Sequence, residues 1–69
     1  MGGVGMTTDE ALARLRSDWA LIRSEDYQTE KPGWAVDYAP NGEGLWRLGW
    51  GATVAEAIEA AEIRADAEA

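Results

Sequence analysis

Two runs of alternating apolar residues flank a segment with the composition of a turn, and this arrangement constrains the fold most strongly. The alternating side chains are Trp34, Val36 and Tyr38 in the run 34–39, and Trp46, Leu48 and Trp50 in the run 45–50. A period of two is the pattern of a strand with one buried face. The segment 40–44 between them contains Asn41-Gly42, which suits the positive φ of a hairpin tip. The sequence therefore predicts an antiparallel β-hairpin with each alternating set on one face.

A helix is predicted ahead of this hairpin. Thr7 and Glu10 have the spacing of a capping box, in which each residue's side chain accepts a hydrogen bond from the other's backbone N–H. The apolar residues behind the box are Leu12, Leu15, Trp19 and Ile22, at spacings of three, four and three. This spacing predicts an amphipathic helix that runs from Thr7 to about Ser24.

A second helix is predicted after the hairpin. Gly51-Ala52 interrupts the strand pattern, and Thr53 with Glu56 forms a second capping-box spacing. The residues that follow are mostly Ala, Glu and Ile, which are good to tolerable helix formers. The apolar stripe consists of Val54, Ala57, Ile58, Ala61 and Ala65. Its small side chains predict a close approach of this helix to the hairpin.

The predicted fold class is α+β, a helix–β-hairpin–helix (αββα) with both helices packed on one face of a small antiparallel sheet. We expect a single domain over 7–69, a disordered leader over 1–6 and a loop over the polar segment 25–33. A two-stranded sheet is marginally stable alone. A third short strand from residues 25–32, or dimerisation through a strand edge, would remedy this, and the sequence leaves both open.

The chain of 69 residues contains no cysteine and no histidine. Disulfides, thiolate-bound zinc and catalysis by a Ser/His or Cys/His pair are therefore excluded. We expect a protein that is not an enzyme and has no cofactor and no metal. Four tryptophans offer a large apolar area to a core this small.

The net charge of −7 bears on the choice of partner. Affinity for a phosphate backbone comes from Lys and Arg, so we expect no direct binding of nucleic acid. An acidic surface favours a protein partner with a basic surface, although acidity also serves solubility alone. No apolar stretch is long enough to span a bilayer and no signal peptide is recognisable. We expect a cytoplasmic protein that does not bind membranes.

Two sets of residues are candidates for binding a partner. The acidic set, Glu56, Glu59, Glu62 and Asp66, falls on the last predicted helix, where Glu59, Glu62 and Asp66 share one face. The alternative for this set is a solvated helix face. The second set is Trp46 and Trp50, because tryptophan is enriched in the energetic centres of interfaces. The alternative is that both belong to the core, in which case an exposed aromatic among the four tryptophans would still mark an interface.

Two resemblances bear on function. The run Gly49 to Ile58, which contains Gly51-Ala52-Thr53-Val54-Ala55-Glu56-Ala57, is similar to the strand-to-helix junction of HicB-like antitoxins, whose pattern is Gly-Asp-Thr-x-x-Glu-Ala. Ala52 stands where that family usually has Asp. This resemblance implies a small structural or dimerisation module. Such a domain also needs a first strand, which the predicted elements do not supply.

Very small, acidic, cysteine-free α+β chains also resemble, as a class, the anti-CRISPR proteins of phages and mobile elements. Several families of those occupy the basic nucleic-acid surfaces of an effector complex. This resemblance implies a non-enzymatic inhibitor of a basic, nucleic-acid-handling protein. The antitoxin-like module, which could form a homodimer, is the alternative.

Overall fold

The computed structural model describes residues 7–26 and 28–67, and the predicted leader 1–6 lies outside the described residues. The elements in chain order are α1 (Thr8–Ala13), β1 (Trp19–Glu25), β2 (Pro32–Tyr38), β3 (Trp46–Gly51) and α2 (Val54–Ala67). The α+β class is confirmed. The predicted order of helix, hairpin and helix is not, because three strands separate the two helices.

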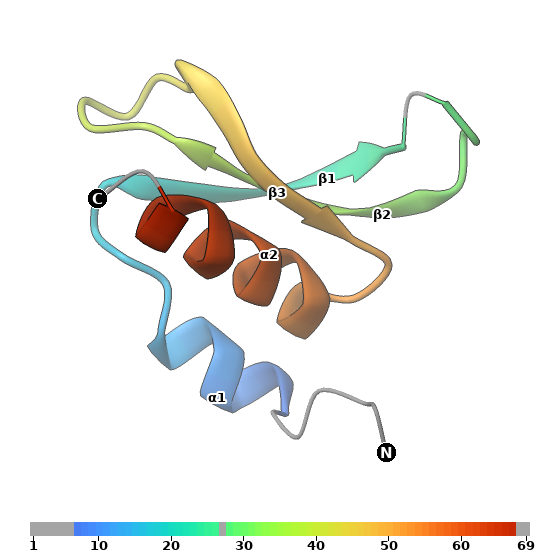
Figure 1. Ribbon diagram of the computed structural model, residues 1–69, viewed down its shortest axis with the longest axis horizontal. Helices are drawn as coiled ribbons and strands as arrows, with labels where there is room; N and C mark the ends of the chain where they lie inside the picture. Colours follow the sequence, from blue (N-terminus) through green and yellow to red (C-terminus); the bar gives the residue numbers. More distant parts are fainter. Residues whose placement is uncertain (1–6, 27, 68–69) are drawn as a thin grey trace.

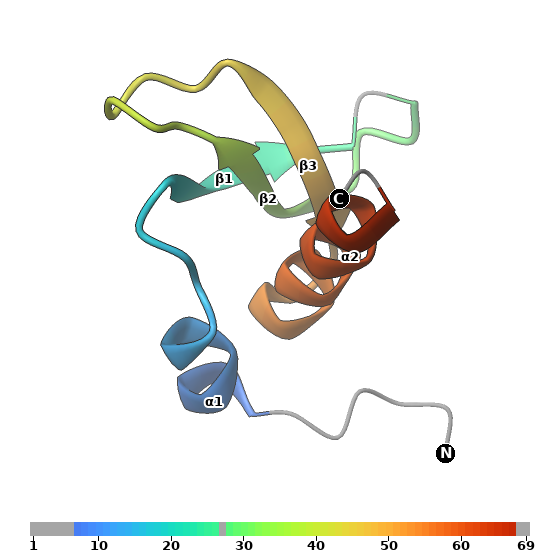
Figure 2. The same cartoon turned by 60° about the vertical axis from the view of Figure 1, so that its left-hand side comes forward.

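The sheet is an antiparallel meander with the order β1-β2-β3. Helix α2 crosses one face of it, over β3 and β2 (Figure 1). Helix α1 lies below α2 in Figure 1 and at its side in Figure 2, and it packs chiefly against that helix. The prediction that both helices pack on the sheet therefore holds for α2 alone.

The first predicted helix is correct at its start and wrong at its end. The capping box between Thr7 and Glu10 is present in both directions. The helix nevertheless ends at Ala13, and Trp19–Glu25 forms β1, which pairs with β2 along its whole length. Two of the four apolar residues that fit a helical period, Trp19 and Ile22, lie in β1. The side chain of Trp19 is on the core side of this strand. Pairing with β2 gives the sheet a third strand, and this non-local gain outweighs the local helical pattern.

The third strand therefore comes from 19–25 and not from 25–32. The β1–β2 connection is shorter than the predicted loop, because β2 already begins at Pro32. Pro32 has no N–H, but it lies beyond the end of β3, whose pairing with β2 stops at Trp34. Its missing donor therefore removes no ladder hydrogen bond.

The β2–β3 hairpin is confirmed, and a bulge changes which residues share a face. Val36 pairs with Gly49 and Asp37 pairs with Arg47, so Leu48 is an extra residue on β3. Leu48 joins the core under α2, whereas Trp50 lies on the opposite face of the sheet, against Gly33. The prediction that Trp50 shares a face with Leu48 is wrong, because one extra residue reverses the alternation.

The core lies between α2 and the sheet and also includes Ala11 of α1. Its buried members are Ala11, Trp19, Val36, Leu48, Val54, Ala55, Ala57, Ile58 and Ala61. The predicted apolar stripe of α2 is thus confirmed, with Ala65 partly buried at its end. A Cβ built on Gly49 would lie 2.5 Å from the backbone nitrogen of Ala61. Helix α2 therefore approaches β3 as closely as its small side chains predict.

Candidate functional site

The outer face of α2 is the most strongly charged surface of a single element. The hydroxyl of Thr53 accepts a hydrogen bond from the Glu56 N–H at 3.2 Å and caps the helix N-terminus. Because the apolar stripe is buried, the opposite side of the helix faces solvent. The exposed residues there include Glu56, Glu59, Ile63 and Asp66. The structure thus brings three of the four predicted acidic residues together on an open surface.

Ile63 lies among these acids and has an exposed fraction of 65%. The helical period places it four residues after Glu59 and three before Asp66, on the same side of the helix. Sequence reasoning missed Ile63 as a candidate. The sequence did contain a signal for it. Ile63 is a large apolar residue outside the apolar stripe that predicts the buried face, so an exposed position could have been predicted.

Glu62, the fourth predicted acidic residue, has a different environment. The Arg14 side chain reaches it from the end of α1, with Nε donating to Oε2 at 2.9 Å and Nη2 donating to Oε1. The side chain of Glu62 is 19% exposed. This paired contact fastens α1 to α2, so Glu62 is less accessible to a partner than Glu59 or Asp66.

The charge of α2 is poorly balanced within the helix. Its residues 54–67 contain four carboxylates and the single base Arg64. The two ion pairs found in the described ranges, Arg14–Glu62 and Arg47–Asp37, do not involve Glu56, Glu59 or Asp66. The outer face therefore presents a negative potential to solvent.

The β2–β3 hairpin carries a second exposed surface. Leu45 is 57% exposed and Trp46 is 50% exposed. The ring of Trp46 stacks on Tyr38, with 4.8 Å between the ring centroids. Trp46 is therefore the exposed aromatic among the tryptophans, held in place by its stacking partner.

Trp50, the other predicted aromatic candidate, is half-buried on the face of the sheet opposite α2. Its Nε1 donates to the Ser24 carbonyl oxygen at 2.9 Å. Nearby, Arg47 donates through Nε to Asp37 at 3.0 Å and through Nη1 to the Ser24 hydroxyl at 3.1 Å. These bonds connect all three strands, which gives Trp50 a structural role on this face.

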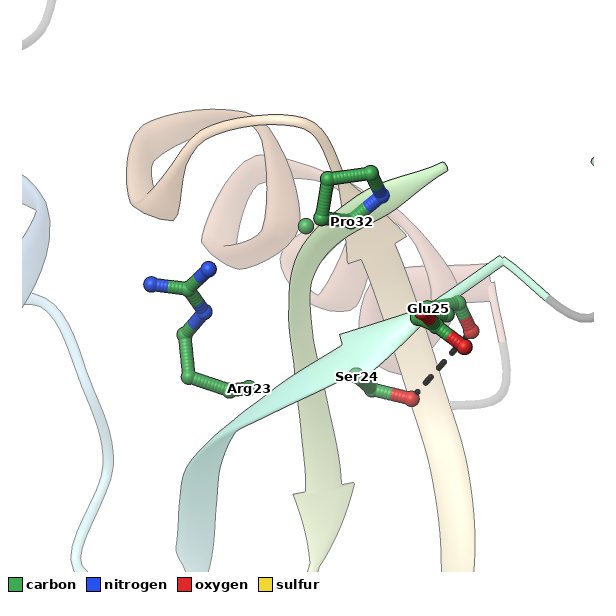
Figure 3. A pocket seen from close by; sticks show the side chains of 5 residues that line it. Arg23, Ser24, Glu25 and Pro32 are labelled. Carbon is green, nitrogen blue, oxygen red and sulfur yellow. Dashed lines mark hydrogen bonds between the residues drawn. The ribbon is translucent and has the colours of Figure 1, made fainter. Parts of the chain in front are cut away.

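A shallow hollow of about 220 Å³ lies at the β1–β2 hairpin. Figure 3 shows Arg23, Ser24, Glu25 and Pro32 around it, with Gly33 completing the lining. The Ser24 hydroxyl donates to the backbone carbonyl of Glu25 at 3.4 Å and accepts a hydrogen bond from Nη1 of Arg47. The guanidinium carbon of Arg23 lies 4.8 Å from the centroid of the Trp34 ring. This is not the arrangement of a nucleophile with its base.

Among residues 7–26 and 28–67, two carboxyl groups have shifted pKa values, and both belong to local turns. The backbone N–H of Thr7 donates to Glu10 at 2.8 Å and, with the Thr7 hydroxyl, holds the pKa of that carboxyl below its ordinary value. The Thr29 hydroxyl donates to Asp26 at 2.6 Å and holds the pKa of Asp26 below its ordinary value. Both shifts favour the charged form of an exposed group and neither indicates a general acid.

The comparisons with known proteins yield no relative. No protein-family model matches the chain, and no curated protein or solved structure matches it. Within residues 7–26 and 28–67, no helix is long and apolar enough to cross a membrane. The same described part of the chain holds no group of three or more side chains placed to bind a metal ion. The outer face of α2, which exposes Glu56, Glu59, Ile63 and Asp66, is the principal candidate site.

Proposed function

We propose that this chain is a non-enzymatic binding protein that docks the outer face of α2 on a basic surface of a nucleic-acid-handling protein. The supporting observation is the position of Ile63, which is 65% exposed on a face that also carries Glu59 and Asp66. An exposed apolar side chain of this size among charged neighbours has the composition of an interface centre with a polar rim.

The two kinds of residue contribute differently. Burial of an isoleucine side chain supplies about 1.5–3 kcal/mol, which favours Ile63 as the anchor in a groove. The surrounding carboxylates contribute mainly to the association rate and to the choice of a basic partner, and salt weakens this contribution. Docking through α2 therefore combines a non-polar contact with salt-dependent recognition.

Proteins that hold nucleic acid supply the required surface, because they line their grooves with Lys and Arg. A chain that covers such a groove with carboxylates competes with the phosphate backbone. We propose an inhibitor of this kind, with an RNA-guided CRISPR effector complex as the specific version. The class resemblance to anti-CRISPR proteins supports that version, as does the net charge of −7.

Charge reversal on α2 tests this proposal. The chain is first used to capture partners from cells that carry candidate effector complexes, and Kd is then measured against salt concentration. The double variant Glu59→Lys/Asp66→Lys should weaken binding at least about tenfold, which corresponds to about 1.4 kcal/mol, and should flatten the salt dependence. Ile63→Ala should weaken binding and leave the salt dependence unchanged.

The matched control is Glu30→Lys/Glu43→Lys, which changes the net charge equally at exposed loop positions. Glu62 is excluded from the test, because its reversal also breaks the contact with Arg14. Equal binding by the wild type and by the α2 double variant rules out the proposed docking surface.

A second candidate function, a HicB-like structural module, gains support from β1. The predicted elements lacked the first strand that such a domain needs, whereas the structure has a strand at Trp19–Glu25. After α1, the order is three meandering strands followed by a helix that Thr53 caps. This module would self-associate through the hairpin, so Trp46→Glu should dissociate a dimer in light scattering while the α2 double variant leaves it intact. A dimer that tolerates Trp46→Glu but dissociates in the α2 double variant excludes this candidate.

A further inference from the structure

We propose that the free edge of β1 is a homodimer interface, through which two copies of the chain join their sheets. This surface is separate from α2, so the inference stands or fails independently of the proposed function. Strand β1 is an outer strand of the sheet, and β2 is the one described element beside which it lies. A strand edge of this kind presents unpaired backbone donors and acceptors to a second strand.

The backbone groups that point outward can be identified from the ladder. Ala39 donates to the Asp18 carbonyl at 2.6 Å and Asp26 donates to the Lys31 carbonyl at 2.9 Å, one at each end of the β1–β2 pairing. Ladder bonds in an antiparallel pair alternate between successive residues. The even-numbered residues of β1 therefore bond to β2, and the N–H and C=O groups of Leu21 and Arg23 point to the free edge.

The other outer strand is less suited to pairing. The bulge at Leu48 disturbs the regular spacing of outward groups along β3, and bulges protect sheet edges from association. Strand β1 pairs with β2 over seven residues without a register shift. It contains no proline and no lysine, which are common edge-blocking residues. The regular edge is thus the one on β1.

A two-fold axis at Ile22 gives the longest overlap of β1 with a second copy. In this register Ile22 is opposite Ile22 of the second copy, Leu21 is opposite its Arg23 and Trp19 is opposite its Glu25. Ile22 is 37% exposed on the face of the sheet away from α2. The two isoleucines would form a directly opposed pair with Cα atoms about 4.5 Å apart. The dimer therefore covers an apolar side chain that the monomer leaves exposed.

The charges fit the same register. The Arg16 guanidinium carbon lies 4.6 Å from the centroid of the Trp19 ring. Glu25 of the second copy, opposite Trp19, therefore comes next to Arg16, and the two-fold axis produces this pair twice. Arg23 leans over Trp34 on the neighbouring strand and so away from the edge. The two copies of Arg23 do not oppose each other, which makes the interface electrostatically self-complementary.

Antiparallel pairing of this kind has consequences for the geometry of the assembly. The two-fold axis lies perpendicular to the sheet, so the dimer has one continuous six-stranded sheet with both α2 helices on the same side. Each copy then presents its acidic outer face in the same direction. A partner with two basic sites would bind the dimer with a gain in avidity.

Amide exchange combined with light scattering tests the interface. Raising the concentration of the wild-type chain should convert monomer to dimer and slow hydrogen exchange of the Leu21 and Arg23 amides. The Ile22 and Ser24 amides, which bond to β2 in either state, should keep their rates. A chain that remains monomeric at millimolar concentration, or exchange that is independent of concentration at Leu21 and Arg23, overturns the proposal.

Substitutions test the register. Ile22→Lys places two like charges directly opposite each other and should abolish the dimer, whereas Leu45→Lys, at an exposed apolar position on the hairpin, should not. Glu25→Arg alone should weaken association at least about tenfold, and Arg16→Glu added to it should restore the dimer. Circular dichroism verifies that each variant is folded. A dimer that tolerates Ile22→Lys is held together through another surface and contradicts the inference.

Discussion

Trp50 Nε1 donates a hydrogen bond of 2.9 Å to the carbonyl oxygen of Ser24, although β3 and β1 are not neighbours in the sheet. The indole reaches β1 by crossing β2 at Gly33. A Cβ built on Gly33 would lie 2.5 Å from the Trp50 ring and 2.6 Å from the Gly51 carbonyl oxygen. Glycine at this position is thus a condition for the contact between the two outer strands.

Gly33→Ala should lower the free energy of unfolding by about 1–3 kcal/mol, because the added methyl group overpacks a site that has no room for it. Urea denaturation followed by tryptophan fluorescence measures the loss. In a Trp50→Ala background the cost of Gly33→Ala should fall but not vanish, since the contact with Gly51 remains. An unchanged stability of Gly33→Ala contradicts the described path of the indole.

Gly49→Ala should destabilise the chain more than Gly33→Ala. The new Cβ would lie 2.5 Å from Ala61 N and 2.9 Å from Ala57 O, which are backbone atoms of α2 and cannot rotate away. The helix must shift, so the amide chemical shifts of Ala57 and Ala61 should change along with the midpoint of unfolding. Glu59→Ala on the outer face is the control and should change stability by no more than about 0.5 kcal/mol.

The Arg14–Glu62 pair should contribute about 0.5–1 kcal/mol to the docking of α1. Its side chains are 53% and 19% exposed, so solvent screens much of their attraction. Because Arg14 has a further interaction, a double-mutant cycle with Arg14→Ala and Glu62→Gln is needed to isolate the pair. The coupling energy should shrink at high salt. Additive single variants show that the pair contributes nothing to stability.

Thr29→Val should raise the pKa of Asp26 toward its ordinary value, because the hydroxyl that stabilises the carboxylate is removed. A pKa lowered in the folded state stabilises the fold above the unfolded pKa, about 3.9 for aspartate, and the effect is lost as pH falls through the folded pKa. NMR titration of the Asp26 side-chain carbon measures the shift. Thr29→Ser should retain the lowered pKa of Asp26. An unchanged Asp26 titration in Thr29→Val shows that a group other than the Thr29 hydroxyl lowers this pKa.

The elements that could be predicted from the sequence were those with local signals. Both helix caps, at Thr7 and Thr53, and the β2–β3 hairpin depend on short-range chemistry and were found. The apolar spacing in the segment 19–25 fits a helix and wrongly predicts one. The segment forms a strand because it pairs with β2. The stability that a third strand adds to the sheet cannot be predicted from a local sequence pattern.

The candidate site was predicted in part for similar reasons. The acidic character of α2 follows from composition, but the contact between Arg14 and Glu62 spans 48 residues and needed the tertiary structure. The prediction for the face of Trp50 is wrong because the bulge at Leu48 adds one residue to β3. Gly49, beside that bulge, was the available signal, since glycine within a strand often marks a bulge or a close approach.

The contact between α2 and β3 has a consequence for how this protein can change over generations. Gly49 and Gly51 meet the backbone of α2 directly, so the position of the helix is set by main-chain atoms rather than by large interlocking side chains. Substitutions on the inner face are strongly restricted. The outer face, by contrast, can vary residue by residue without moving the axis that carries it. The residues of the outer face can therefore change while the architecture is conserved.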